Sequence, residues 1–317
     1  MKYIVTGAAG FIGSNLVERL LQDGQNQVLG LDNLSTGRVE FLKESLKSSN
    51  FKFLEVDITN KETLIEVFSG YEYVYHLSAN ADVRFGLNHP FKDIEQNTIG
   101  TFNVLEAMRS NDIKKISFSS TGSVYGEASV IPTPEDAPFP IQTSLYGSSK
   151  LAGESLITSY CEGYNFVANI FRFVGILGER YTHGHIYDFY KKLKQNPEEL
   201  EILGDGKQRK SYLCVQDCID AMQLVENTKT ASINIYNLGV DSYCEVLDSV
   251  EIICDFMEVS PRLTFTGGER GWVGDNPFIY LDTEKIRSLG WEPKFTIEEG
   301  VIKTVNYLKD NEWVFNT

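Results

Sequence analysis

The segment Thr6-Gly7-Ala8-Ala9-Gly10-Phe11-Ile12-Gly13 decides the fold of this chain. It follows a short apolar stretch at 3–5 and leads into residues 14–21, whose apolar side chains have helical spacing. Glycines at the point where a strand passes into a helix permit a tight turn and let the backbone approach a pyrophosphate. The N-terminus of the helix adds free N–H groups and the positive end of its dipole. The segment therefore predicts a dinucleotide-binding turn, with contacts from Gly7, Gly10, Phe11, Ile12 and Gly13.

An acidic residue follows at the distance that such a turn requires. A second apolar strand is expected at 28–31, and Asp32 stands at its end. A carboxylate there can accept hydrogen bonds from the adenosine ribose, and it would repel a 2′-phosphate. The sequence therefore favours NAD over NADP as the cofactor, although Arg38 slightly weakens that preference.

Strands and helices continue to alternate along the chain. We expect strands at 51–56, 73–77, 114–119 and 166–173, and helices at 61–68, 90–111 and 146–163. This alternation predicts an α/β fold with a doubly wound parallel (Rossmann) sheet. Ligands of such sheets bind at the carboxyl ends of the strands. That rule brings to one rim Gly7, Asp32, Ala79, Thr121 and Phe173.

Tyr146 and Lys150 are four residues apart in a segment expected to be helical. At that spacing the two side chains share one face of the helix. A free phenol has a pKa of about 10, and a nearby cation lowers it. The pair is therefore a candidate proton acceptor for an alcohol. The spacing by itself is common on surface helices, and only its place on the predicted rim makes the pair a functional candidate.

The composition limits the partners and the compartment. The formal net charge of −15 argues against a nucleic-acid partner. The five cysteines are odd in number and form no CxxC, so we expect free thiols in a reducing compartment. No apolar run is long enough for a membrane span, and the first strand leaves no room for a signal segment. We therefore expect a cytoplasmic protein.

We expect no metal site, because His183 and His185 lack the third ligand that such a site would need.

Several motifs together resemble those of one family. The chain is similar to the extended short-chain dehydrogenase/reductases and, within them, to the NAD-dependent nucleotide-sugar epimerases. The matching segments are TGAAGFIG (6–13), DNLSTG (32–37), VDI (56–58), HLSANADV (76–83), NTIGT (97–101), SSTGSVYGE (119–127), YGSSK (146–150), GDGKQRKSY (204–212), VQD (215–217) and LGWEP (289–293).

The resemblance implies roles for individual residues. Tyr146 would be the acid/base on the sugar 4-hydroxyl, Lys150 would lower the Tyr146 pKa and bind the nicotinamide ribose, and Thr121 would hydrogen-bond the same hydroxyl. Further cofactor contacts are implied at Asn33, Asp57, Ile58, Leu77, Ala79, Asn97 and Phe173. Substrate contacts are implied at Thr121, Ser123, Arg209, Lys210 and Arg270.

The resemblance also implies a reaction, with alternatives. A 4-epimerase needs only Thr121, Tyr146 and Lys150, and a UDP-hexose or derivative is the expected substrate. The related 4,6-dehydratases carry Asp and Glu directly after the threonine, where this chain has Gly122 and Ser123. An oxidoreductase with net hydride transfer uses the same three residues and stays open. A non-catalytic NAD-binding protein is a third hypothesis, against which the intact catalytic residues argue.

The expected organisation is a large domain with a smaller C-terminal substrate lobe. Residues 1–174 with 212–240 would bind NAD, and residues 175–211 with 241–317 would bind the nucleotide sugar. Many relatives have an asparagine where this chain has Gly175, which leaves the identity of the sugar open. The helices at 90–111 and 146–163 resemble those that form the family's homodimer.

Overall fold

The computed structural model describes residues 1–80, 82–138, 141–228, 231–276 and 278–315. The contacts divide the chain into two compact units, and each is described by itself. Unit 1 comprises Met1–Val124, Leu145–Arg172 and Met222–Tyr236, and unit 2 comprises Tyr125–Ser144, Phe173–Ala221 and Asn237–Thr317. The two domains predicted from the sequence were defined by the ligand that each would bind, NAD or the nucleotide sugar. The division into units does not test ligand binding, so these domains stay a prediction.

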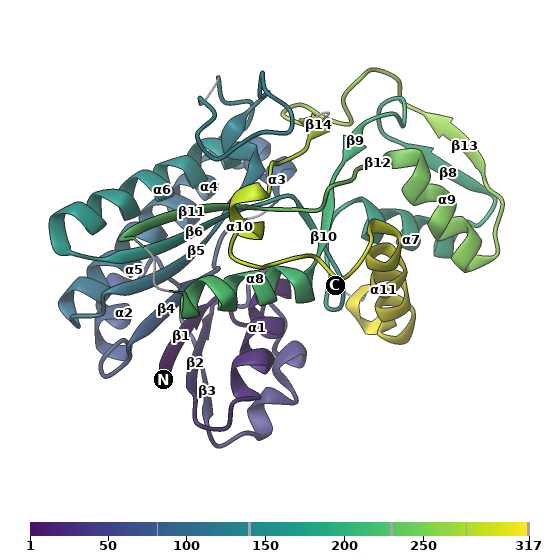
Figure 1. The fold of residues 1–317 in the computed structure, drawn as a ribbon. Coiled ribbons are helices and arrows are strands. Elements are labelled where there is room, and N and C mark those ends of the chain that lie inside the picture. The colour runs from purple at the N-terminus through teal and green to yellow at the C-terminus, as the bar shows by residue number, and fades with distance from the viewer. Residues whose placement is uncertain (81, 139–140, 229–230, 277, 316–317) are drawn as a thin grey trace. The chain divides into compact units, whose positions relative to one another are not determined.

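A seven-stranded sheet has the order β11-β6-β5-β4-β1-β2-β3. The first strand therefore lies inside the sheet, and the chain winds outward from it in both directions. The strands β1, β2, β3, β4 and β5 pair in parallel. The predicted doubly wound sheet is confirmed (Figure 1). Its strands are β1 (Lys2–Thr6), β2 (Gln27–Asp32), β3 (Phe51–Glu55), β4 (Tyr73–His76), β5 (Lys115–Thr121), β6 (Val167–Phe173) and β11 (Ile233–Leu238).

The helices between these strands follow the predicted alternation. The region expected to be one helix at 90–111 contains a short α-helix, a π-helical stretch and a longer α-helix. Short 3₁₀ turns lie at Val39–Leu42, Ser45–Lys47 and Gly122–Tyr125. The helices are α1 (Phe11–Leu21), α2 (Lys61–Val67), α3 (Val83–Asn88), α4 (Pro90–Asp93), the π-helix η3 (Ile94–Ile99), α5 (Gly100–Ser110), α6 (Leu145–Tyr164) and α8 (Val215–Asn227).

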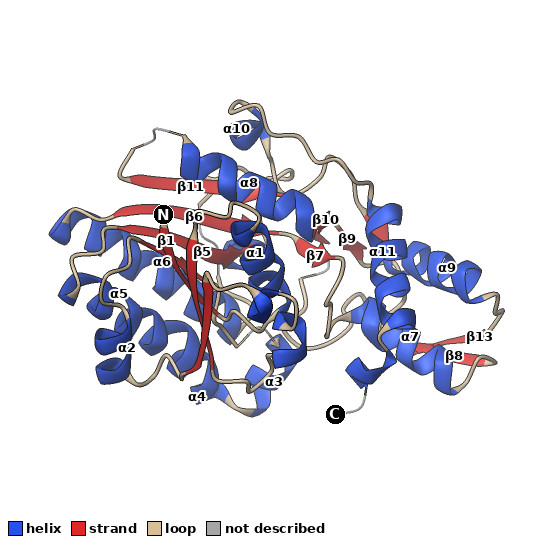
Figure 2. Ribbon diagram, turned by 90° about the horizontal axis from the view of Figure 1, so that it is seen from below, coloured by secondary structure: helices blue, strands red, loops and turns tan. Residues whose placement is uncertain are grey.

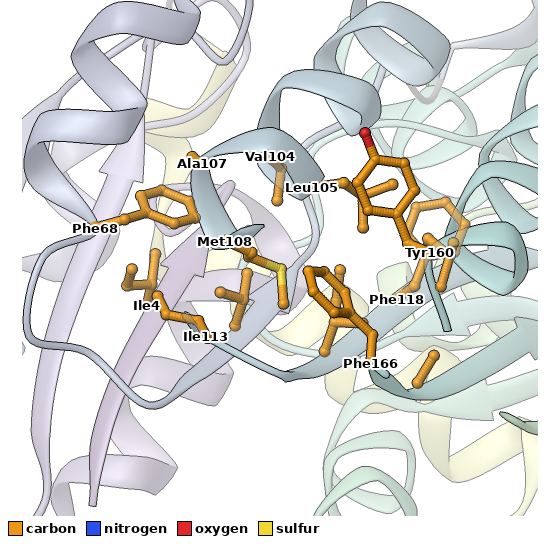
Figure 3. Packing of buried hydrophobic residues seen from close by; sticks show 14 of the residues in the cluster. Ile4, Phe68, Val104, Leu105, Ala107, Met108, Ile113, Phe118, Tyr160 and Phe166 are labelled. Atoms are coloured by element: carbon orange, nitrogen blue, oxygen red, sulfur yellow. The ribbon is translucent and has the colours of Figure 1, made fainter. Parts of the chain in front are cut away.

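One face of the sheet is covered by α2, α5 and α6, which lie together in both ribbon views (Figure 2). Ile4 and Val74 point from the strands into this layer, and Met108 and Ile157 meet them from the helices. Figure 3 shows Ile4 and Met108 among the packed side chains of this cluster. Burial of this apolar surface is the main force that holds the layers together.

Residues that alternate with these in the strands point to the opposite face. There the hydroxyls of Tyr3 and Tyr75 both donate to the carboxylate of Glu226 on α8, at 2.6 Å for Tyr3. Tyr73 packs beside both rings and bonds Ser117. Because both faces are covered, the strands read as nearly continuous apolar runs.

The described residues of unit 2 contain short strand pairs, the first part of α8 and four further helices. The strands β7 (Gly175–Leu177) and β10 (Tyr212–Cys214) pair in parallel, as do β8 (Glu199–Ile202) and β13 (Arg262–Phe265). Strand β9 (Arg209–Lys210) lies between β12 (Cys244–Glu245) and β14 (Phe278–Ile279). The helices are α7 (His185–Gln195), α9 (Val246–Met257), α10 (Glu284–Arg287) and α11 (Ile297–Asp310), and a 3₁₀ turn follows at Glu312–Phe315. Among the described residues, no helix is long and apolar enough to cross a bilayer.

Candidate functional site

The glycine turn joins β1 to α1, as its sequence predicts. Gly7 has a φ of +70°, and a Cβ there would lie 2.8 Å from the backbone nitrogen of Ser78. A Cβ on Gly13 would collide with the carbonyl oxygen of Gly7. Only glycine allows this close approach of helix to turn. The absence of side chains at these glycines leaves the backbone of the turn accessible to a ligand.

The first turn of α1 fits an anionic pyrophosphate. Gly10 is its N-cap and Phe11 and Ile12 are its first residues; within these described residues no side chain caps the helix and no acid occupies the first turn. The positive end of the dipole is thus not offset locally. Asp32 lies beside this turn, because its Oδ2 accepts from the Ala9 nitrogen at 3.0 Å. The residues present fit a dinucleotide.

Asp32 and Asp57 form an acidic edge at the ends of β2 and β3. Oδ1 of Asp32 accepts from the Leu34 nitrogen at 2.9 Å. Burial raises the pKa of Asp32, against these backbone hydrogen bonds. Burial acts to raise the pKa of Asp57 too, but hydrogen bonds from Thr59 and Asn33 bring it below its ordinary value. Asn33 is therefore tied to Asp57 by a 2.7 Å bond.

Asn97 lies in the π-helix and connects two parts of unit 1. Its Oδ1 accepts from the Asn80 nitrogen at 2.8 Å, and its Nδ2 donates to the Asn80 oxygen and to Ser149 Oγ at 2.9 Å. Leu77 and Ala79 are half-buried in the same segment as Asn80. The side chain of Asn97 thus holds the loop after β4 against α6. The predicted cofactor contact stays a prediction, and this geometry favours an indirect one.

The remaining predicted cofactor residues are placed differently. Ile58 is 3% exposed and belongs to the apolar core below α5, so its side chain serves packing. Phe173 ends β6 and belongs to unit 2. It is therefore described apart from the residues of the turn.

His76, at the end of β4, is a buried link beneath the rim. Its Nδ1 lies 2.8 Å from Thr6 Oγ1, and its Nε2 lies 2.9 Å from Thr101 Oγ1. Thr101 donates to the Asn97 oxygen, so it accepts from Nε2–H of His76, and Thr6 then donates to Nδ1. Burial lowers the pKa of His76 to about 3, and the charge of Lys150 acts in the same direction. His76 is therefore neutral.

Tyr146 and Thr121 are brought together, as predicted. Tyr146 lies in the first turn of α6 and Thr121 ends β5, and the Thr121 hydroxyl is near enough to act on the pKa of the Tyr146 phenol. Thr121 Oγ1 also accepts from the Ser123 nitrogen at 3.1 Å. Burial raises the pKa of Tyr146 to about 12; the Thr121 hydroxyl opposes this shift and the charge of Asp93 adds to it. The lowered Tyr146 pKa predicted from the sequence is thus not found in the chain alone, because the cost of burying a phenolate prevails.

Lys150 follows one turn later and is 1% exposed. Its ammonium lies 4.1 Å from the centre of the Phe118 ring. Burial lowers the pKa of Lys150 to about 7, against the charge of Glu154. A cation over a ring face is stabilised electrostatically, which offsets part of the desolvation.

Three residues that the sequence did not single out lie next to the catalytic groups. Glu154 on α6 forms a buried ion pair with Arg172 on β6, and it also accepts from the hydroxyl of Ser120. The available signal was position, because Tyr146, Lys150 and Glu154 repeat every four residues on one helix face. A glutamate in a helix ordinarily belongs to a solvated face, so the pattern alone did not identify it.

The predicted phosphate-binding cations lie in unit 2. Lys210 Nζ is 2.7 Å from Asp275 Oδ1 and 2.7 Å from the Asn276 oxygen. Arg270 pairs with Glu127 and also reaches the Asp275 oxygen at 3.4 Å. Lys210 and Arg270 therefore converge on Asp275.

Arg209 is placed apart from that pair of cations. Its guanidinium carbon lies 3.9 Å from the centre of the Phe278 ring and 5.6 Å from that of Tyr243. The guanidinium therefore lies close over the ring of Phe278 on β14, with Tyr243 farther away, a position that suits its planar shape. Its predicted substrate contact stays a prediction.

Gly175, the residue that leaves the identity of the sugar open, faces an aromatic ring. A Cβ at this position would lie 2.6 Å from the ring of Tyr212, its partner in the β7–β10 register. The hydroxyl of Tyr212 lies 2.9 Å from Nδ1 of His185. The ring occupies the space that a longer side chain at 175 would need. Within the described residues, no three His, Cys, Asp or Glu side chains gather into a metal site.

This fold and its glycine turn define a dinucleotide-binding α/β protein, and the catalytic roles of Thr121, Tyr146 and Lys150 stay a prediction. The family model described as the NAD-dependent epimerase/dehydratase family matches residues 3–239. The chain belongs to this family.

Several similar proteins are named as epimerases of nucleotide sugars, and others are named as dTDP-glucose 4,6-dehydratases. The chain is 34% identical to a putative UDP-glucose 4-epimerase of Methanocaldococcus jannaschii, over 97% of this chain and 98% of that protein. It is 33% identical to a UDP-glucuronate 4-epimerase of Thermodesulfobacterium geofontis, over 98% and 96%. A solved UDP-glucuronic acid 4-epimerase of Bacillus cereus, in complex with UDP-glucuronic acid and NAD, has a TM-score of 0.90 and 29% identity, over 98% of this chain and 99% of that one.

Proposed function

We propose that this chain is an NAD-dependent epimerase that inverts C4 of a nucleotide sugar, a UDP-hexose or a UDP-hexose derivative. The observation that carries the proposal is the placement of Tyr146, in the first turn of α6, beside Thr121, which ends a strand of the sheet that carries the glycine turn. The relatives described above are named as epimerases of UDP-sugars. Gly122 and Ser123 follow Thr121, so the side chains that dehydration needs are missing.

The catalytic side chains handle one proton. Tyr146 accepts the proton of the sugar 4-hydroxyl and later returns it, while Thr121 holds the same oxygen by a hydrogen bond. NAD, when bound, supplies the hydride acceptor and, in its oxidised form, a positive charge. A positive charge beside Tyr146 favours phenolate and offsets the burial that raises its pKa. Lys150 contributes an ammonium to the same face of α6.

The turn and its acids hold the cofactor. Gly7, Gly10 and Gly13 bring backbone N–H groups to the pyrophosphate, and Asp32 accepts from the adenosine ribose. The remaining contacts with NAD are proposed to come from the side chains or backbone of Phe11, Ile12, Asn33, Asp57, Ile58, Leu77, Ala79, Asn97, Tyr146, Lys150 and Phe173. The domains proposed for NAD and for the sugar are residues 1–174 with 212–240, and residues 175–211 with 241–317.

The experiment that tests the function identifies the sugar product and measures whether the cofactor is oxidised or reduced overall. Purified protein is mixed with UDP-glucose, UDP-glucuronic acid and UDP-N-acetylglucosamine in turn, and products are identified by NMR. We expect one of them to be converted to its C4 epimer without added cofactor and without a lasting change in absorbance at about 340 nm. A stoichiometric change in that absorbance would instead show net hydride transfer, and the oxidoreductase alternative would hold.

The substrate diphosphate is proposed to bind Arg209, Lys210 and Arg270, while Ser123 with Thr121 contacts the sugar. Lys210 is paired with Asp275, so the diphosphate would compete with that carboxylate. We expect Lys210→Met to raise KM at least tenfold with a smaller effect on kcat. Arg262→Met is the control, because Arg262 forms an exposed ion pair with Glu199 in the same unit. An unchanged KM in Lys210→Met would remove this residue from the site.

We also propose that the protein is a cytoplasmic homodimer. Free thiols at all five cysteines are compatible with a reducing compartment. Unit 1 exposes large apolar side chains on the helices that resemble the family's dimer interface. They are Phe91, Ile94, Ile99, Phe102 and Leu145. A patch of this kind marks an interaction surface.

A further inference from the structure

Glu154 is a buried carboxylate that the proposed mechanism does not use. Its side chain lies on the face of α6 that carries Tyr146 and Lys150, and the residue is 3% exposed. A buried carboxylate is stable only when it is paired and hydrogen-bonded. Its partners therefore show what it holds together.

Three donors reach this carboxylate from two strands. Arg172 on β6 donates from Nε to Oε1 at 3.0 Å and from Nη2 to Oε2 at 2.7 Å, a bidentate pair. Ser120 on β5 donates from its hydroxyl to Oε1. Arg172 and Ser120 are 1% and 2% exposed, so the whole group is shielded from water.

The carboxylate is connected to both catalytic positions. Ser120 immediately precedes Thr121, so the Glu154–Ser120 bond holds the end of β5 against α6 two turns beyond Tyr146. Lys150 lies one turn from Glu154, and a nearby negative charge favours the ammonium form of a buried lysine.

We propose that Glu154 is a positioning residue for the reaction, which joins the ends of β5 and β6 to α6 and places a negative charge beside Lys150. Through Ser120 it sets the distance between the Thr121 and Tyr146 hydroxyls. Through its charge it favours the ammonium form of Lys150 against the effect of burial. Arg172 supplies the counter-charge of this buried carboxylate.

Other groups near Lys150 do not supply this charge. His76 on β4 is neutral, and Asp93 on α4 acts on Tyr146. Among the described residues, titratable groups that act in this region are Glu154 and Tyr146 on α6, Arg172 on β6, His76 on β4 and Asp93 on α4.

The test reads the charge of Lys150 without using turnover. Holoenzyme labelled with ¹³C-lysine is titrated by NMR, and the Lys150 signal is assigned by its loss in Lys150→Met. In Glu154→Gln we expect the Lys150 midpoint to fall by roughly one pH unit, the order expected when an opposite charge is removed. Glu154→Asp keeps the charge, and we expect it to restore most of the shift. This measurement needs no substrate, so it tests the effect of Glu154 on Lys150 independently of the proposed function. The role of Glu154 in catalysis rests on the proposed function.

A structural role alone would give a different result. Glu154→Gln leaves Arg172 buried without its counter-charge, which is strongly destabilising, so the double variant Glu154→Gln/Arg172→Gln is measured too. We expect it to regain stability yet keep the low Lys150 midpoint, and its epimerase activity to decline at a lower pH than wild type. Glu106→Gln, which breaks an ion pair with Arg109 in the same unit, is the control. A wild-type Lys150 midpoint in both the single and the double variant would overturn the proposal.

Discussion

At the scale of single residues, the hydroxyl of Tyr146 carries the proposed chemistry. We expect Tyr146→Phe to lower kcat by roughly 10²–10⁴-fold, the range of general acid–base catalysis. Tyr164→Phe is a matched control, because Tyr164 ends the same helix and is 44% exposed. Steady-state rates with the converted UDP-sugar measure both. Near-wild-type turnover in Tyr146→Phe would mean that another group moves the proton.

Lys150 gives a pH dependence of stability with a defined sign. Burial lowers its pKa from 10.5 in the unfolded chain to about 7 in the folded NAD-free chain. Between these values the unfolded state binds more protons, so this group adds stability as the pH rises, by at most about 1.4 kcal/mol per pH unit. We therefore expect the free energy of unfolding of wild type, relative to that of Lys150→Met, to increase between pH 7 and 10. Urea unfolding of the NAD-free proteins measures it. Parallel curves would show that Lys150 titrates at its ordinary pKa.

The sequence predicted the residues of the rim better than their electrostatics. Glycine spacing and Asp32 follow from local pattern, because each depends on its place at the end of a strand or the start of a helix, whereas the pairing of Thr121 with Tyr146 is implied by the family resemblance. The raised pKa of Tyr146 could not be read there, since it depends on what covers the hydroxyl. Glu154 was missed because its partner Arg172 lies on another element, 18 residues away in the chain.

At the scale of elements, the contact between the turn and α1 can be tested with one methyl group. Gly13→Ala places a Cβ against the carbonyl oxygen of Gly7, so the helix must move away from the turn. We expect a lower melting temperature and loss of the stabilisation that added NAD gives. In Gly163→Ala the new Cβ meets nothing within 4 Å, and we expect unchanged or slightly higher stability. Equal NAD-induced shifts in the two variants would place the cofactor elsewhere.

The π-helix at Ile94–Ile99 shows where prediction of elements from sequence ends. Apolar spacing at 90–111 indicated one helix, and most of that region is helical. The wider turn places Asn97 between Asn80 and Ser149, and these contacts come from a loop and another helix. Such long-range hydrogen bonds leave no periodic signal, although π-helical turns often mark functional sites.

At the scale of the whole molecule, the exposed apolar patch of unit 1 predicts the assembly. Phe91 and Phe102 are 62% and 39% exposed, on α4 and α5. In an isologous contact the same surface of both copies meets, so Phe91 and Phe102 of each copy would be buried. We expect Phe91→Glu/Phe102→Glu to be monomeric in sedimentation experiments in which wild type is a dimer.

The control for this surface is Val273→Glu, because Val273 is 75% exposed in unit 2 and lies outside the patch. A charge in the centre of a dimer contact is desolvated and faces its own copy, so it costs several kcal/mol twice, whereas the same charge at Val273 stays in water. Val273→Glu should therefore sediment as wild type does. If wild type is monomeric, or if the double variant still forms dimers, then the helices α4 and α5 do not form the interface.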